Sequence, residues 1–208
     1  MGTLFGDQRQ SARLYRFVSR FYDTLRPLFA GFPGTRAAYY EFFVPEPGAQ
    51  VLDLGCGTGA STRELAERVD PDGGVHGLDL SPEQVGMASR KSALHEAAFV
   101  VGDATHLPYR DAVFDGVASV GSLQHVPDVG SALAEAHRVT APGGHLFVVG
   151  PRRPDGPIAG AVADALMHFM RPAEMERLAR GAGWTDVETR LVHMDYLARE
   201  ALVVTGTA

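Results

Sequence analysis

The stretch Gln50-Val-Leu-Asp-Leu-Gly-Cys-Gly-Thr-Gly59 passes from a short apolar run directly into a glycine-rich turn. A helical pattern follows from Ala60 to Val69, with Ser61 and Glu64 at the spacing of a capping box. A strand, a glycine turn and a helix in this order bring the backbone close to a ligand at the helix N-terminus. The stretch therefore predicts the first unit of a domain that binds a nucleoside-containing ligand.

Downstream of this unit, short apolar runs alternate with helical patterns, which is typical of parallel strands joined by crossover helices. A second capping box, Ser81-Pro-Glu-Gln84, predicts a helix start with proline at the first helical position. The predicted strands span 74–79, 98–101, 114–120, 145–149, 184–192 and 196–205, and the further helices span 129–139, 158–170 and 173–180. A hairpin between the last two strands would make the final strand antiparallel. The expected fold is α/β with three layers.

Residues 1–48 are expected to form a helical appendage, and residues 49–208 the main domain. The first helix of the appendage has an apolar face and a stripe of arginines at positions 9, 13, 16 and 20. The stripe has two interpretations: a face that lies on anionic lipid, or an ordinary solvated face.

Composition excludes several classes of protein. The chain has 208 residues, 45% of them hydrophobic and 21% charged, which indicates one soluble globular domain with a small addition. A net charge of −6 disfavours nucleic acid as a partner. A single cysteine, Cys56, allows no internal disulfide, and the histidines are not spaced as metal ligands. With no membrane-spanning run and no secretory signal, a cytoplasmic location is the default expectation.

Three acidic residues stand where predicted strands end. Asp53 lies two residues before the first glycine, where it would repel a pyrophosphate and attract an ammonium or sulfonium charge, both of which S-adenosylmethionine carries. Asp79 is placed to accept hydrogen bonds from ribose hydroxyls, and Asp103 from an adenine amino group. The alternative is structural: Asp53 bonded only by backbone amides, Asp79 preceding a helix cap, and Asp103 in a turn.

The glycine turn and the segments after it resemble the ordered motifs of class I S-adenosylmethionine-dependent methyltransferases. The similarity covers about residues 49–205 and begins with Val51 to Gly59, which resembles the first motif of this class. Further upstream, Phe21-Tyr-Asp23 is similar to a Tyr-Asp pair in the N-terminal helices of the ubiquinone/menaquinone-type group. The other matching segments are Gly77-Leu-Asp-Leu-Ser81, Gly102-Asp-Ala-Thr-His-Leu-Pro108, Phe114-Asp-Gly-Val117, Leu123-Gln-His-Val-Pro-Asp128, Glu135 to Val139, Pro142-Gly-Gly-His-Leu146 and Leu178 to Trp184.

This resemblance implies a Rossmann-like sheet of seven strands in the order 3-2-1-4-5-7-6, with strand 7 antiparallel, helices on both faces and an N-terminal helical lid. It also implies which residues bind the cofactor S-adenosylmethionine and its product S-adenosylhomocysteine. The methionine end of the cofactor would lie over the glycines and near Ser119. Asp79 would bind the ribose, Asp103 would bind the adenine, and Tyr22 would act as a lid. The implied cofactor-binding set is Tyr22, Asp53, Gly55, Gly57, Gly59, Asp79, Leu80, Asp103, Ala104 and Ser119.

Methyl transfer from a sulfonium needs alignment and exclusion of water, and it needs a general base only when the nucleophile must lose a proton. His125 is the first candidate base, with a packing role as its alternative, and Tyr22 is a candidate orienting hydroxyl. Arg152 and Arg153 would either receive an acidic substrate or be solvated or salt-bridged.

The sequence thus predicts a methyltransferase that uses S-adenosylmethionine and acts on an O, N or C nucleophile of a small molecule. Two alternatives remain: a member of the fold that binds the cofactor without methylating, through cyclisation, rearrangement or binding alone, and an NAD(P)-dependent oxidoreductase. The expected partner is a small-molecule substrate, with no nucleic acid, no metal and no stable membrane insertion. A homodimer is left open.

Overall fold

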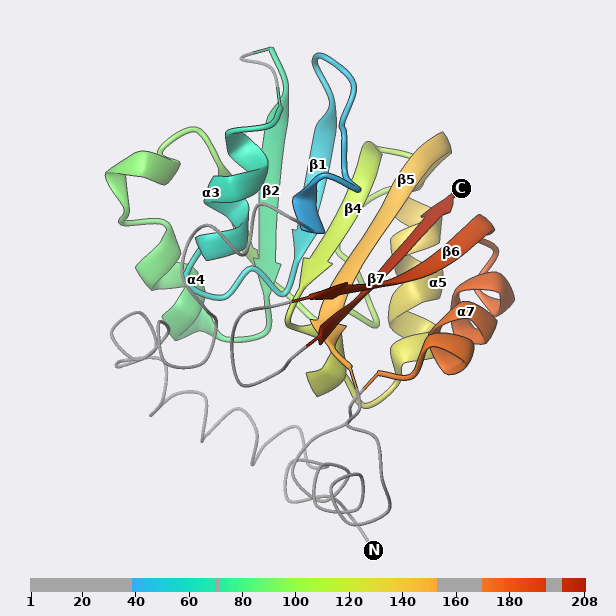
Figure 1. Cartoon of the computed structure of the whole chain (residues 1–208). Helices are drawn as coiled ribbons and strands as arrows, with labels where there is room; N and C mark the ends of the chain where they lie inside the picture. The colour runs from blue at the N-terminus through green and yellow to red at the C-terminus, as the bar shows by residue number, and fades with distance from the viewer. Residues whose placement is uncertain (1–38, 70–71, 153–169, 194–199) are drawn as a thin grey trace, which may run out of the picture.

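A seven-stranded sheet in the order β3-β2-β1-β4-β5-β7-β6 forms the centre of the molecule (Figure 1). The computed structural model describes residues 39–69, 72–152, 170–193 and 200–208. The strands are β1 (Gln50–Leu54), β2 (Gly74–Asp79), β3 (Ala98–Val101), β4 (Phe114–Val120), β5 (Thr140–Pro151), β6 (Thr185–His193) and β7 (Glu200–Thr207). The first five strands pair in parallel, and β7 is antiparallel to both β5 and β6. The predicted strand order and antiparallel final strand are confirmed.

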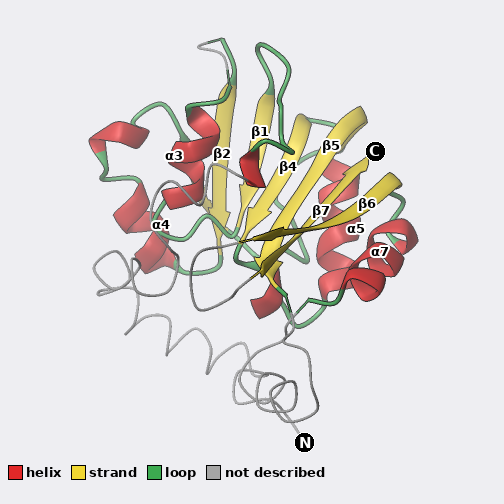
Figure 2. Ribbon diagram, in the orientation of Figure 1, coloured by secondary structure: helices red, strands yellow, loops and turns green. Residues whose placement is uncertain are grey.

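Helices cover both faces of the sheet (Figure 2). They are α3 (Ala60–Ala66), α4 (Pro82–Ala88), α5 (Val129–Val139) and α7 (Pro172–Gly181), with short 3-10 turns η1 (Ser92–Leu94) and η2 (Leu123–His125). One apolar layer joins the sheet to α5 and α7, and a second joins its other face to Leu65 of α3. The expected three-layer α/β fold is therefore present.

Neighbouring strand residues serve the two layers alternately. Val51 packs in the second layer and Leu52 in the first, and both are fully buried. The same alternation separates Val117 from Ala118 on β4. Because both faces of these strands are buried, the strands appear in the sequence as continuous apolar runs rather than alternating ones.

The last residues of the predicted appendage pack on the second layer. The ring of Phe43 stacks on Phe147 of β5 at 5.2 Å between centroids, and the Tyr40 ring lies 5.6 Å from the same ring. Arg68, just beyond α3, lies over Tyr40 at 4.4 Å. The described part of the appendage, residues 39–48, is thus anchored to the sheet, while residues 1–38 lie outside the described ranges.

Several predicted boundaries differ from the structure. The strand predicted at 145–149 extends over Thr140–Pro151, because the chain joins the sheet before the Pro142-Gly143-Gly144 segment. Helix α3 ends at Ala66 instead of Val69. The strand predicted at 196–205 extends to Thr207, and the first four residues of its predicted range lie outside the described residues. The helix predicted at 158–170 lies outside the described residues except for Met170.

The two predicted capping boxes have different outcomes. The Ser81 hydroxyl caps α4 by accepting a hydrogen bond from the Gln84 amide, as expected. The backbone amide of Ser81, which a full capping box would direct to the Gln84 side chain, donates to Asp79. The capping box at Ser61 is wrong: the N-cap of α3 is Gly59, which has no side-chain cap. Ser61 lies one position inside the helix, and its hydroxyl donates to Asp53 instead.

Candidate functional site

The glycine turn lies at the carboxyl end of β1 and leads into α3. Gly55, Gly57 and Gly59 all have positive φ, at 78°, 55° and 83°. The amides of Gly55 and Cys56 donate to the Leu78 carbonyl of β2, at 2.7 and 3.0 Å. Gly57 adopts a left-handed conformation that a residue with a side chain would disfavour, and its amide donates to Asp79. The turn is therefore fixed against the neighbouring strand.

Asp53 is fully buried under this turn. Its Oδ2 accepts hydrogen bonds from the hydroxyls of Ser61 at 2.8 Å and Thr62 at 2.7 Å, so hydroxyls and not backbone amides satisfy this oxygen. Its Oδ1 is also buried and has no partner among the residues that the structure describes. Burial, and secondarily the charge of Asp79, raises the pKa of Asp53 to about 6. The site thus contains a buried carboxyl group with one oxygen that no described residue bonds.

Asp79 ends β2 and holds two backbone segments. Its Oδ2 accepts from the Gly57 amide and its Oδ1 from the Ser81 amide, both at 2.9 Å. Burial raises the pKa of Asp79, and these two hydrogen bonds oppose that rise. Next to it, Leu80 exposes 49% of its surface, which is high for a leucine beside a core strand. The acid fixes the turn, and the leucine offers an apolar surface beside it.

Asp103 stands just beyond the end of β3, the strand that pairs with β2. Asp79 pairs in register with Val101, and the Gly102 amide donates to the Asp79 carbonyl at 3.0 Å. Asp103 is half-buried, and its Oδ1 accepts from the amide and hydroxyl of Thr105, both at 2.9 Å. Ala104 packs against the apolar layer under α5. Asp103 therefore stabilises a turn, as the structural alternative predicts. It also lies at the same edge of the sheet as Asp79.

The end of β4 supplies the hydroxyl and imidazole groups. Ser119 is buried, and its hydroxyl lies 2.5 Å from the hydroxyl of Ser122. Ser122 donates its single proton to the Leu54 carbonyl at 2.7 Å, so Ser119 is the donor between the two serines. His125 follows in η2, with its amide bonded to the Ser122 carbonyl at 2.9 Å. Burial lowers the pKa of His125 to about 4, so its imidazole is neutral at pH 7.

Nearly all the sequence-predicted site residues in the described ranges lie at or just beyond the carboxyl ends of four adjacent strands, β3, β2, β1 and β4. Tyr22, Arg153 and the arginine stripe lie outside the described residues. Arg152 is paired with Glu200, in agreement with the salt-bridged alternative. Within the described ranges, no group of three or more histidine, cysteine or acidic residues is arranged to hold a metal ion.

Sequence reasoning missed the residues that support the site. Ser61 and Thr62 were overlooked because the capping-box spacing suggested another role for Ser61, although two adjacent hydroxyls in the first turn after an acidic strand end are a usable signal. Ser122 gave no signal, because its contact with Leu54 joins residues 68 positions apart.

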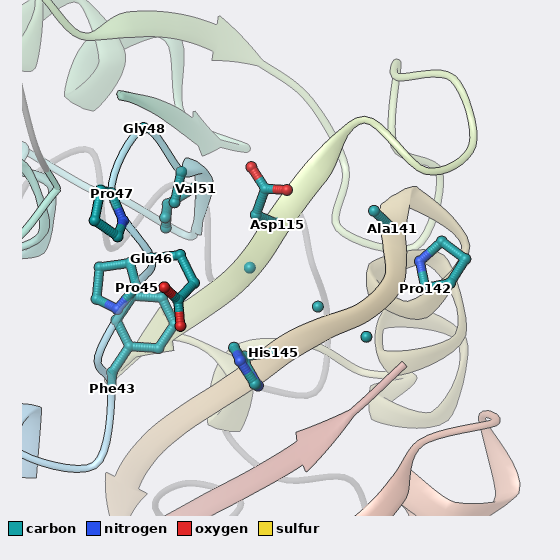
Figure 3. Close-up of a pocket in the computed structure, with 14 residues that line it drawn as sticks. Phe43, Pro45, Glu46, Pro47, Gly48, Val51, Asp115, Ala141, Pro142 and His145 are labelled. Atoms are coloured by element: carbon teal, nitrogen blue, oxygen red, sulfur yellow. The ribbon is translucent and has the colours of Figure 1, made fainter. Parts of the chain in front are cut away.

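A pocket of about 390 Å³ lies at the opposite edge of the sheet (Figure 3). It is formed near the starts of β1, β4 and β5, with Phe43, Glu46, Asp115 and His145 among its lining residues. Asp115 accepts a hydrogen bond from the Gln50 amide at 2.8 Å, which is a structural role. None of the predicted site residues lines this pocket. The structure also contains, within its described residues, no helix long and apolar enough to cross a membrane.

Comparison with known proteins places these features in context. A family model described as a methyltransferase domain matches residues 52–148. The chain is 30% identical to a demethylmenaquinone methyltransferase of Roseiflexus castenholzii, over 86% of this chain and 87% of that one. It is 36% identical to the chloroplastic 2-methyl-6-phytyl-1,4-hydroquinone methyltransferase 2 of Oryza sativa subsp. japonica, over 89% of this chain. The chain spans about half the length of this rice protein and of two similar plant relatives.

Solved structures share the fold. The [4+2]-cyclase SpnF matches with a TM-score of 0.80 and 20% identity, covering 100% of this chain and 98% of that one. A SAM-dependent methyltransferase from Aquifex aeolicus matches with a TM-score of 0.70 and 21% identity, covering 92% and 96% of the two chains. At these identities the likeness concerns the fold alone, because one fold supports different chemistries.

Proposed function

We propose that this chain, which belongs to the class I S-adenosylmethionine-dependent methyltransferases of the ubiquinone/menaquinone group, methylates a small quinol-type substrate. The proposed cofactor is S-adenosylmethionine, and the proposed product is S-adenosylhomocysteine. The proposal narrows the O, N or C nucleophile expected from the sequence to an electron-rich aromatic carbon or its neighbouring hydroxyl.

Asp53 carries the cofactor assignment. Its buried carboxylate has one oxygen without a partner among the described residues, and burial raises its pKa to about 6. An ammonium or sulfonium group nearby would stabilise the ionised form, whereas a pyrophosphate would add repulsion. The residues at this edge therefore fit a cationic nucleoside ligand better than a nicotinamide dinucleotide.

The other residues of the site receive roles in the same proposal. Each carboxylate oxygen of Asp79 accepts one backbone amide and has a further lone pair for a ribose hydroxyl. Asp103 accepts from the adenine amino group, and Leu80 and the Ala104 amide adjoin the base. The glycines allow close approach of the methionine portion, near Ser119. Tyr22, outside the described residues, is assigned as a lid and orienting hydroxyl.

When bound, S-adenosylmethionine supplies an electrophilic methyl group on a sulfur that leaves without charge. The chain then has to align the nucleophile and keep water out. His125 is neutral at pH 7, so it accepts a hydrogen bond from a phenolic hydroxyl and increases the electron density of the ring. A pKa of about 4 makes His125 a weak base that orients the hydroxyl, and the proton that the methylated carbon or oxygen then loses passes to solvent water.

The substrate class follows from the relatives. The Roseiflexus relative is named for a demethylated menaquinone, and the rice relative for a phytyl hydroquinone. Both names describe prenylated, redox-active rings, and we extend this class to the present chain.

Two further parts of the proposal rest on composition. The single cysteine supports a cytoplasmic location, and the net charge of −6 supports the absence of a nucleic-acid partner. Light scattering after size-exclusion chromatography measures whether the protein is a monomer or a homodimer in solution.

The experiment is a methyl-transfer assay with purified protein and isotopically labelled S-adenosylmethionine. The nucleophiles are reduced demethylmenaquinone, 2-methyl-6-phytyl-hydroquinone and, as a non-quinol control, phosphoethanolamine. The variants are Asp79→Ala and the matched Asp115→Ala, whose carboxylate bonds a backbone amide at the opposite edge of the sheet.

We expect label in a quinol product with wild type and Asp115→Ala, and none with Asp79→Ala. Binding of the cofactor without its consumption by any nucleophile would contradict methyl transfer and would favour the non-methylating alternative. Transfer to phosphoethanolamine alone would contradict the substrate class.

A further inference from the structure

The last turn of α5 holds the loop that follows β3. Arg138 binds Glu135 through both carboxylate oxygens, with Nε to Oε1 and Nη2 to Oε2 at 2.7 Å each. The same guanidinium reaches three groups of the loop: the Leu107 carbonyl at 3.2 Å, the Tyr109 carbonyl at 2.9 Å and the Asp111 carboxylate at 2.7 Å. One side chain thus fixes the loop at three points.

Glu135 adds a fourth point. Its Oε2 accepts a hydrogen bond from the Leu107 amide at 2.7 Å, so both polar backbone groups of Leu107 are bonded to this ion pair. The hydrogen bond between the two side chains lowers the pKa of Glu135 and raises that of Arg138. The side chains are 23% and 32% exposed, which leaves the pair only partly screened by water. The pair therefore remains charged through the physiological pH range.

The loop depends on these bonds for its shape. Near its start, the His106 amide donates to the Asp103 carbonyl, and near its end the Ala112 amide donates to the Arg138 carbonyl. Between these points, the Leu107 amide donates to Glu135, and the Leu107 and Tyr109 carbonyls accept from Arg138. Asp103 and Ala104 lie at the beginning of this loop, so the ion pair fixes the segment that carries them.

We infer that the Glu135–Arg138 pair is a positioning element of the adenine subsite, and that it sets how strongly the site discriminates adenine from other bases. This inference rests on the proposed function, because it takes Asp103 as the acceptor for the adenine amino group. Neither side chain touches the cofactor in this account. Both act through the loop.

Arginine suits this position for a geometric reason. Its planar guanidinium directs several donors at once toward the Glu135 carboxylate, two carbonyls and the Asp111 carboxylate. A lysine ammonium is a single point of charge with three donors, and it cannot span these acceptors together. Arg138→Lys therefore preserves the charge and removes the fixed geometry.

The test compares two ligands that differ at the base. S-adenosylhomocysteine has an amino group on its purine, and S-inosylhomocysteine has a carbonyl oxygen there, which an acceptor such as Asp103 would reject. Calorimetry measures both affinities for wild type, Arg138→Lys and Glu135→Gln. The matched control is Arg180→Lys, which alters the Glu176–Arg180 pair of α7 on the same side of the sheet. Circular dichroism melting confirms that each variant is folded at the titration temperature.

We expect wild type and Arg180→Lys to prefer the adenine ligand by about tenfold or more, the order contributed by one charged hydrogen bond. In Arg138→Lys and Glu135→Gln this ratio should fall toward one. A general loss of stability would weaken both ligands together and leave the ratio unchanged, so an unchanged ratio in folded Arg138→Lys and Glu135→Gln overturns the inference. Failure of wild type to bind S-adenosylhomocysteine would instead overturn the proposed function, and the inference with it.

Discussion

A Cβ added to Gly55 would lie 2.3 Å from the Cβ of Ser122. Ser122 fills the space beside the glycine turn and donates its hydroxyl proton to the Leu54 carbonyl at 2.7 Å. Its carbonyl in turn accepts the His125 amide. The turn proposed to hold the cofactor and the segment that carries the candidate base are therefore in direct contact.

Gly55→Ala should destabilise the protein for two reasons, a φ of 78° and the contact with Ser122. Gly143→Ala is a matched control, because Gly143 has a φ of 81° but nothing lies within 4 Å of its added Cβ. We expect the control to lower the free energy of unfolding by about 1 kcal/mol and Gly55→Ala to lower it by about 1–3 kcal/mol more. Urea unfolding measures both, and equal losses would show that the contact with Ser122 has no energetic role.

Asp53 should make stability depend on pH. Its carboxyl has a pKa of about 6 in the folded protein against an ordinary pKa of 3.8, so at pH values between the two the folded state holds a proton that the unfolded state has lost. The free energy of unfolding therefore falls as the pH rises from about 4 to 6, by about 3 kcal/mol from this group. Asp53→Asn should remove this part of the slope in urea unfolding at pH 4.5 and 7. Parallel profiles for wild type and variant would contradict the raised pKa.

His125 should titrate far below the usual range. Burial lowers its pKa from 6.5 to about 4, so its ring remains neutral from pH 8 down to about 5. Because the folded pKa is lowered, the associated stability is complete above about 6.5 and is lost as the pH falls toward 4. Carbon-detected NMR of the imidazole, assigned with a His125→Asn sample, follows the titration. A midpoint near 6.5 would place the ring in water and remove the basis for its proposed role.

Ser81→Ala separates the stability of α4 from ligand binding. The variant loses the N-cap bond to the Gln84 amide, which should cost about 1 kcal/mol in the free energy of unfolding. The bond from Ser81 to Asp79 uses the backbone amide and is retained. We therefore expect the affinity for S-adenosylhomocysteine to remain within about twofold of wild type, while thermal melting shifts downward. A large loss of affinity would mean that the Ser81 side chain itself takes part in the site.

The sheet was predictable because the strands are short, apolar and separated by clear helix signals. Gln50–Leu54, Gly74–Asp79, Ala98–Val101, Phe114–Val120 and the helix Val129–Val139 have the predicted bounds. The early start of β5 was missed, since the glycines at 143 and 144 indicated a turn before the strand. Backbone pairing with β4 already includes Thr140.

The site was predictable only in its outline. Acids at strand ends can be seen in a sequence, and the structure brings Asp53, Asp79 and Asp103 to one edge. Their partners depend on contacts across the fold, such as the bond from Ser122 to Leu54 and the bonds from Arg138 to the loop after β3. The segment that contains Glu135 and Arg138 was noted only for its resemblance to the family, and only the folded loop shows what the two side chains hold.

The cofactor assignment is decided by calorimetric titration of wild type and Asp79→Ala with S-adenosylmethionine, S-adenosylhomocysteine and NADH. We expect micromolar binding of both adenosyl ligands by wild type, loss of that binding in Asp79→Ala, and no binding of NADH. Binding of NADH alone would contradict the cofactor assignment and would support an oxidoreductase.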